Sequence, residues 1–185
     1  MDDARRGLST DQIADTMNAR SFIRIWSLSL YILLGAALPS SAQAGSSTRL
    51  LESDSFGRVR IRYAHKPLIV HIWGLTCGPC LEELPRWGEF EKLHPDMNLV
   101  LIQADDAPID AVRSALDHAA LGSVESWSVP SELDEFSRAR IDPSWNGEMP
   151  RTLLIAADGS VTTVRGVSDP VQIARWLTLQ SVGTK

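Results

Sequence analysis

The sequence contains only two cysteines, and this scarcity excludes several classes of protein. A small exported domain that depends on disulfides for stability needs several cysteine pairs. A closed zinc site would need further ligands beside Cys77 and Cys80, and the histidines show no spacing that would supply them. We therefore expect neither a disulfide-stapled scaffold nor a resident metal or other cofactor.

Clusters of basic residues are also missing. The formal net charge is −5, and because the charges of residues 1–44 balance, residues 45–185 carry all of it. Without a patch rich in lysine or arginine, nucleic-acid binding has no electrostatic support. Hydrophobic residues make up 44% of the chain and charged residues 22%, as in ordinary globular proteins. The length fits one domain plus an export segment.

The apolar run near the N-terminus, Ile25–Leu38, is too short for a typical membrane span. As a helix it would reach about 21 Å, against roughly 30 Å for the hydrocarbon core of a bilayer. Arg20 and Arg24 precede the run, and a small-x-small sequence ends at Ala44. A positive flank, a short apolar core and such a site are typical of a secretory signal peptide.

We therefore predict a signal peptide over residues 1–44, with Met17 as an alternative start and an uncleaved anchor as an alternative fate. In both cases the positive-inside rule places the rest of the chain outside the cytoplasm. Residues 45–56 are predicted to be a polar lead-in, and residues 57–182 to be the folded domain.

The two cysteines are separated only by Gly78–Pro79. Residues 67–73 form an apolar, β-branched run typical of a buried strand, and residues 78–94 have a helical pattern. Cys77 would then lie at a helix start, where free backbone N–H groups and the helix dipole stabilise a thiolate. The proline fits the first helical turn, and Cys80 lies close enough to form a disulfide with Cys77.

This spacing favours redox chemistry over a structural role. Closing so short a loop removes only about 2 kcal/mol of unfolded-state entropy. By contrast, a pKa lowered from about 8.5 to about 7 raises the thiolate fraction at pH 7 from about 3% to about half. Cys77 is thus the predicted nucleophile and Cys80 the resolving thiol. A copper(I) site on the two thiolates and a peptide-binding module with an inert disulfide remain alternatives.

The segment Trp73–Pro85 reads W-x3-C-x2-C-x2-E-x-P and resembles the thioredoxin superfamily, in particular the TlpA/ResA-like branch of exported thiol–disulfide oxidoreductases. A second block of this family begins at Met149 and ends with Gly166. The resemblance implies that Pro150 is cis and faces the cysteine pair. Such a bend would leave the backbone of Met149 free to pair with an extended substrate.

The resemblance implies an α/β, thioredoxin-like fold, in which helices flank both faces of a central mixed sheet. We expect an edge strand over residues 57–63, a strand at 97–104 and an antiparallel hairpin over 151–165. Helices are expected over 108–120 and 169–180. A helical insertion should precede the cis-proline block, around residues 121–147, with a short helix near 131–139.

Several residues are predicted to support the cysteines: Trp73, Gly78, Pro79, His71, Glu83 and Met149. His71 stands six residues before Cys77, where thioredoxin carries an acidic proton acceptor. It could accept the proton of Cys80, but we favour a neutral core histidine bonded to a neighbour. Glu83 could tune the thiol pKa values or simply lie at the solvated edge of the helix. Arg151 follows Pro150, where the branch devoted to cytochrome c maturation has an acidic residue.

The resemblance thus implies a monomeric enzyme of the periplasm that reduces disulfides in exported proteins. Electrons would come from a membrane-bound thiol donor, and substrates could belong to cytochrome c or copper-oxidase maturation. The alternatives are a disulfide oxidase or isomerase, or a copper(I)-binding assembly factor with the same fold.

Overall fold

The computed structural model describes residues 48–182, so the predicted signal peptide lies outside the described residues. Between Thr48 and Val182, no helix is both long enough and apolar enough to span a membrane.

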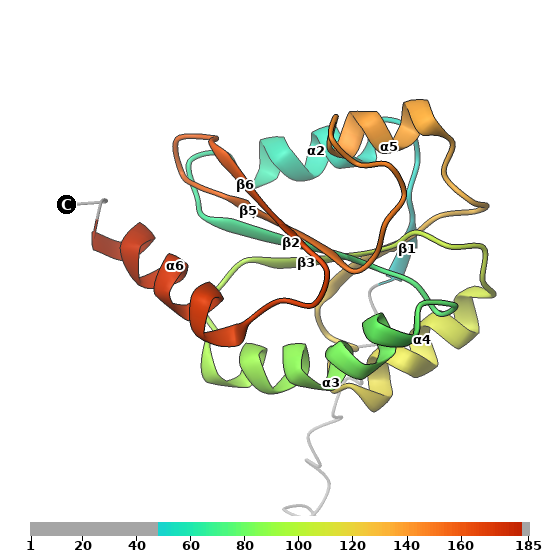
Figure 1. Ribbon diagram of the computed structural model, residues 1–185, viewed down its shortest axis with the longest axis horizontal. Helices are drawn as coiled ribbons and strands as arrows, with labels where there is room; N and C mark the ends of the chain where they lie inside the picture. The colour runs from blue at the N-terminus through green and yellow to red at the C-terminus, as the bar shows by residue number, and fades with distance from the viewer. Residues whose placement is uncertain (1–47, 183–185) are drawn as a thin grey trace, which may run out of the picture. The chain divides into compact units, whose positions relative to one another are not determined.

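A single mixed sheet forms the centre of the domain (Figure 1). Its order is β1-β4-β3-β2-β5-β6, with parallel pairing from β1 to β2 and antiparallel pairing from β2 to β6. The strands are β1 (Thr48–Leu50), β2 (Leu68–Trp73), β3 (Leu99–Gln103), β4 (Glu125–Ser128), β5 (Arg151–Ile155) and β6 (Val161–Arg165).

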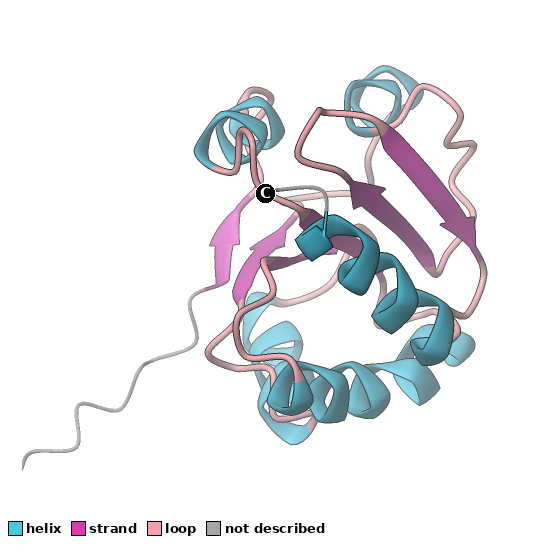
Figure 2. Ribbon diagram, turned by 90° about the vertical axis from the view of Figure 1, so that its left-hand side faces the viewer, coloured by secondary structure: helices cyan, strands magenta, loops and turns pink. Residues whose placement is uncertain are grey.

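Helices cover both faces of this sheet, as predicted. Figure 1 shows α2 and α5 on one face and α3, α4 and α6 on the other, and Figure 2 shows the same layers from the side. The helices are α2 (Ser55–Arg62), α3 (Gly78–Leu93), α4 (Ile109–His118), α5 (Glu135–Ile141) and α6 (Pro170–Val182).

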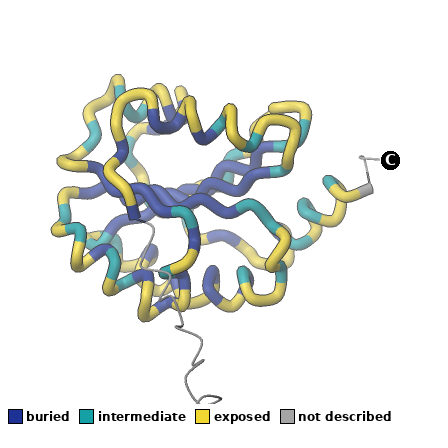
Figure 3. The backbone as a smooth tube through the Cα atoms, turned by 180° about the vertical axis from the view of Figure 1, so that it is seen from behind, coloured by how far each residue is buried: buried dark blue, intermediate teal, exposed yellow. Residues whose placement is uncertain are grey.

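The central strand β2 is buried along its whole length because both faces of the sheet are covered (Figure 3). Side chains alternate across a strand, so Val70 and Ile72 pack in the core beneath α2 and α5. Ile69 and Trp73 pack in the opposite core with α3, α4 and α6. The continuous apolar run predicted this strand correctly, since a strand between two layers needs no polar face.

The edge strand predicted over residues 57–63 is wrong, because this segment lies in helix α2. The alternation of Val59, Ile61 and Tyr63 suggested a strand, but Phe56, Val59 and Tyr63 also match helical spacing. The helical pattern is the one that fits the core: Phe56 and Val59 are buried, whereas Ile61 is 77% exposed.

The segment around residues 121–147 is only partly helical, which corrects the predicted helical insertion. It contains strand β4, which pairs with β3 and β1, before the short helix α5. Strand β1, inside the expected lead-in, joins the same sheet. Both strands are short and polar, so their place in the sheet depends on backbone pairing, of β4 with β3 and of β1 with β4, more than on apolar side chains.

The antiparallel hairpin of β5 and β6 is confirmed. Asp158 accepts hydrogen bonds from the N–H and the hydroxyl of Ser160, at 2.9 and 2.7 Å. Gly159 has a φ of +88°, a conformation that residues with a side chain rarely adopt.

Candidate active site

Cys77 and Cys80 form a disulfide at the start of α3, with their Cα atoms 5.2 Å apart. Cys77 is the N-cap residue, and its sulfur accepts a hydrogen bond from the N–H of Cys80 at 3.3 Å. Gly78 and Pro79 are exposed in the first turn. Cys77 is half-buried and Cys80 fully buried, so only the first sulfur is open to a partner molecule.

The turn before Cys77 is held by a carboxylate from the neighbouring strand. Asp105, just beyond β3, accepts hydrogen bonds from the N–H groups of Leu75 and Thr76 at 3.0 and 2.6 Å. It also accepts one from the Thr76 hydroxyl at 2.7 Å. A Cβ on Gly74 would lie 2.7 Å from the Asp105 Cγ atom, so this close approach requires glycine.

Pro150 lies beside the end of β2, from which the cysteine turn departs. The Met149–Pro150 peptide bond is cis, as the resemblance implied. Arg151 pairs with Ile72, which places Pro150 at the end of the sheet where β2 leads into the cysteine turn. Cys77 and Met149 both pack against the core on the α3 side. Within residues 48–182 the backbone of Met149 makes no hydrogen bond, although Pro150 accepts one from the N–H of Gly166.

A chain of polar side chains crosses the core on the α3 side. Nδ1 of His71 lies 3.0 Å from the Thr152 hydroxyl, which lies 2.9 Å from the Ser168 hydroxyl. The N–H of Ser168 donates to Oε1 of Glu83 at 2.8 Å, and the indole N–H of Trp87 donates to the same oxygen at 3.0 Å. Glu83 is buried, so of the two alternatives predicted for it the place at a solvated edge is wrong.

Burial acts in opposite directions on the pKa values of the two ends of this chain. It lowers the pKa of His71 from 6.5 to about 3, so the imidazole is neutral. It raises the pKa of Glu83, against the opposing hydrogen bonds from Ser168 and Trp87. Moving a proton from an ordinary thiol to His71 would cost about 7 kcal/mol, which favours the core role for this histidine.

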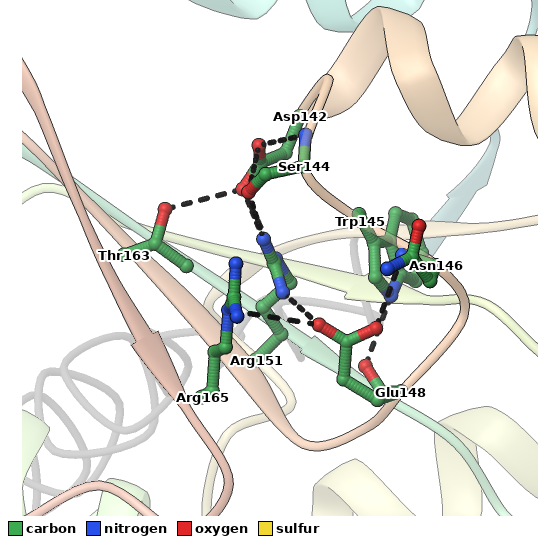
Figure 4. A network of polar contacts seen from close by, with 8 residues as sticks. All are labelled: Asp142, Ser144, Trp145, Asn146, Glu148, Arg151, Thr163 and Arg165. Carbon is green, nitrogen blue, oxygen red and sulfur yellow. Dashed lines mark hydrogen bonds and ion pairs between the residues drawn. The ribbon is translucent and has the colours of Figure 1, made fainter.

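Arg151 is fully buried and anchors the loop before Pro150 (Figure 4). Its Nε and Nη2 atoms donate to one oxygen of Asp142 at 3.0 and 2.7 Å. The guanidinium also bonds to Ser144 at 2.6 Å and pairs with Glu148. Trp145 closes the loop, because its indole N–H donates to the Glu148 carbonyl at 2.9 Å.

The structure brings together most of the residues predicted from the sequence. Trp73 is fully buried in the core that also contains Cys80, while Cys77 packs against that core from its edge. Sequence reasoning missed Asp105, Asp142 and Ser168 as residues of the site. Only Asp105 carried a usable signal, because polar residues at the carboxyl ends of adjacent parallel strands gather at one sheet edge.

No family model matches the sequence, and no curated protein matches it. Solved structures do resemble the fold. A DsbF homologue from Corynebacterium diphtheriae is 16% identical with a TM-score of 0.55, over 65% of this chain and 75% of that one. A secreted Mycobacterium tuberculosis disulfide oxidoreductase is 20% identical with a TM-score of 0.53, over 64% and 85%.

A third example is the DsbE-type putative thiol:disulfide interchange protein from Chlorobium tepidum, which is 16% identical with a TM-score of 0.52, over 65% of this chain and 83% of that one. At these identities the likeness bears on the fold. The predicted α/β architecture is thereby confirmed, and the chain has the thioredoxin-like fold of these thiol–disulfide oxidoreductases.

Proposed function

We propose that this protein is an exported thiol–disulfide oxidoreductase that reduces disulfides in extracytoplasmic proteins. The observation that carries the proposal is the asymmetric pair at the start of α3: a half-buried Cys77 beside a fully buried Cys80. A structural disulfide needs no exposed sulfur, whereas exchange requires one accessible nucleophile and one shielded resolving thiol.

The reaction begins with the reduced pair. The Cys77 thiolate attacks one sulfur of a substrate disulfide, which forms a mixed disulfide and releases the other substrate sulfur as a thiolate. The Cys80 thiolate then attacks the Cys77 sulfur and displaces the second substrate thiolate. The substrate gains two electrons, and the Cys77–Cys80 disulfide is restored. A membrane-bound thiol donor would reduce the pair for the next cycle.

The free backbone of Met149 supports binding of an extended substrate segment beside Cys77. An unpaired N–H and C=O just before β5, beside the cysteine turn, are groups that an extended substrate segment would bind. Backbone pairing reads no particular side chain, so one site could accept disulfides from several exported proteins, including those of cytochrome c or copper-oxidase maturation.

The proposed location is the periplasm, and the proposed state is a monomer. The signal-peptide pattern of residues 1–44 supports export. The protein from Mycobacterium tuberculosis with a similar fold is described as secreted. The reductive direction rests on the family resemblance of the sequence.

A trapping experiment tests this function. Without its resolving thiol, Cys80→Ser should accumulate mixed disulfides between Cys77 and its substrates in cells. These complexes should be released by dithiothreitol and identified by mass spectrometry. Cys77→Ser is the matched control, because it keeps one thiol but lacks the accessible one. Equal trapping by both variants, or none by Cys80→Ser, would contradict the proposal.

A second prediction concerns Glu83, which lies three residues after Cys80 on the same face of α3. We propose that its carboxylate accepts the proton of Cys80 during resolution. Glu83→Gln keeps the hydrogen-bond acceptor but cannot take up a proton, and should slow resolution by about ten- to a hundredfold. The measurement is the decay rate of a preformed mixed disulfide between about pH 6 and 8.

Glu82→Gln is the matched control, because Glu82 is the exposed neighbour on the same helix. It should leave the decay rate within about twofold of wild type, as expected for a surface charge. A Glu83→Gln protein that resolves the mixed disulfide at the wild-type rate would rule out this role.

A further inference from the structure

Asp105 combines two properties that matter for the nucleophile next to it. It is buried, at 8% exposure, and its carboxylate binds the backbone of Thr76, the residue directly before Cys77. The side-chain NH2 group of Gln103 donates a hydrogen bond to the same carboxylate. The side-chain oxygen of Gln103 in turn accepts a hydrogen bond from the Ser128 hydroxyl. The carboxylate is therefore fixed in position at the active-site turn.

This carboxylate is ionised. Burial acts to raise the pKa of Asp105, but the hydrogen bonds from Thr76, Gln103 and Leu75 outweigh it, and the pKa lies below the ordinary value. No ion pair within residues 48–182 involves Asp105. A negative charge thus lies at the turn without a neutralising cation.

The other acidic groups on the surrounding elements do not place an unpaired, buried charge at this turn. Glu148, in the cis-proline loop, is paired with Arg151. Glu83 lies in the second turn of α3 and not in the turn before Cys77, and it accepts hydrogen bonds from Trp87 and Ser168. Asp106 is exposed to solvent, which screens its charge. Among these groups, Asp105 is the one that is buried, without an ion pair and bonded to the turn directly before Cys77.

From this arrangement we propose that Asp105 is a positioning residue that disfavours the thiolate of Cys77 and so makes the pair a stronger reductant. The inference rests on the proposed disulfide exchange and supplies a physical basis for its reductive direction. The carboxylate repels a negative sulfur on Cys77, and the hydrogen bonds from Leu75 and Thr76 hold the carboxylate at the turn where it acts.

The charge of the cysteine pair differs between its two redox states. The disulfide carries no charge, whereas the reduced pair contains the Cys77 thiolate. A group that destabilises the thiolate therefore shifts the equilibrium toward the disulfide, and the reduced pair gives up its electrons more readily. Neutralising Asp105 should do the opposite and make the protein a stronger oxidant.

The test compares Asp105→Asn with Asp106→Asn, which removes an exposed charge from the next residue. Asp105→Asn should lower the pKa of Cys77 by about one unit, a tenfold change in thiolate formation. The exchange equilibrium with dithiothreitol, measured near pH 9 where the thiolate predominates in both proteins, should shift about tenfold toward the reduced protein. Asp106→Asn should change both quantities by less than about twofold.

The pKa is read from the ultraviolet absorbance of the thiolate during a pH titration of the reduced protein. Asp105→Ser is the second variant, because it removes the charge with a smaller side chain. A folded variant with an unchanged Cys77 pKa would overturn the proposal, as would a failure of both variants to fold, which would show a purely structural role. A wild-type protein that exchanges no disulfides would instead refute the proposed function.

Discussion

Arg151→Met is expected to destabilise the protein by about 3–5 kcal/mol, because it leaves the carboxylate of Asp142 without its cation in a buried site. The hydrogen bonds from Thr163 and Ser144 to Asp142 would remain, but they do not neutralise the charge. The measurement is the free energy of unfolding from urea denaturation at neutral pH.

Two further variants separate the effect of the charge of Arg151 from the effect of its hydrogen-bond geometry. Arg151→Lys keeps the charge but cannot reach Asp142, Ser144 and Glu148 together, so it should lose about half as much stability. Arg165→Met removes an exposed arginine that lies 3.9 Å from Glu148, and should cost less than about 1 kcal/mol. A loss below about 1 kcal/mol for Arg151→Met would show that the loop does not depend on this network.

The second large effect concerns acid stability. His71 has a pKa near 3 in the folded protein, against 6.5 for an unperturbed histidine. As the pH falls below about 6.5, the unfolded chain binds a proton that the folded protein excludes, so stability is lost. The loss should reach about 3 kcal/mol by about pH 4.5 and about 4 kcal/mol by about pH 3, where the folded protein begins to bind the proton as well.

His71→Leu removes the imidazole that binds this proton in the unfolded chain. The free energy of unfolding should then depend less on pH between about pH 6.5 and 4.5. Asp105 and Asp142, whose pKa values are lowered in the folded protein, reduce its stability mainly at a pH below this window. Glu83, whose pKa is raised, has the opposite effect, because the folded protein binds its proton more readily as the pH falls. His118→Leu, on the surface of α4, should retain the wild-type slope. Parallel curves for wild type and His71→Leu would disprove the assignment.

The helices and strands that the sequence predicts correctly are those in which composition, spacing and capping residues all indicate the same element. Strand β2 is apolar and β-branched, and α3 has a capping cysteine and a proline in its first turn. The segment forming α2 was misassigned because its apolar residues fit both a strand and a helix. Strands β1 and β4 were missed because short polar strands are stabilised by partners far away in the sequence.

The sequence alone determined the fold class and the cysteine pair, because strand, turn, cysteines and helix are contiguous and their chemistry is local. The tertiary structure decided what surrounds the pair. Asp105, Glu83 and Arg151 acquire their properties from burial and from partners on other strands and loops, and no local pattern encodes either. A charged residue in the sequence has an ordinary pKa until the fold removes its water and supplies its neighbours.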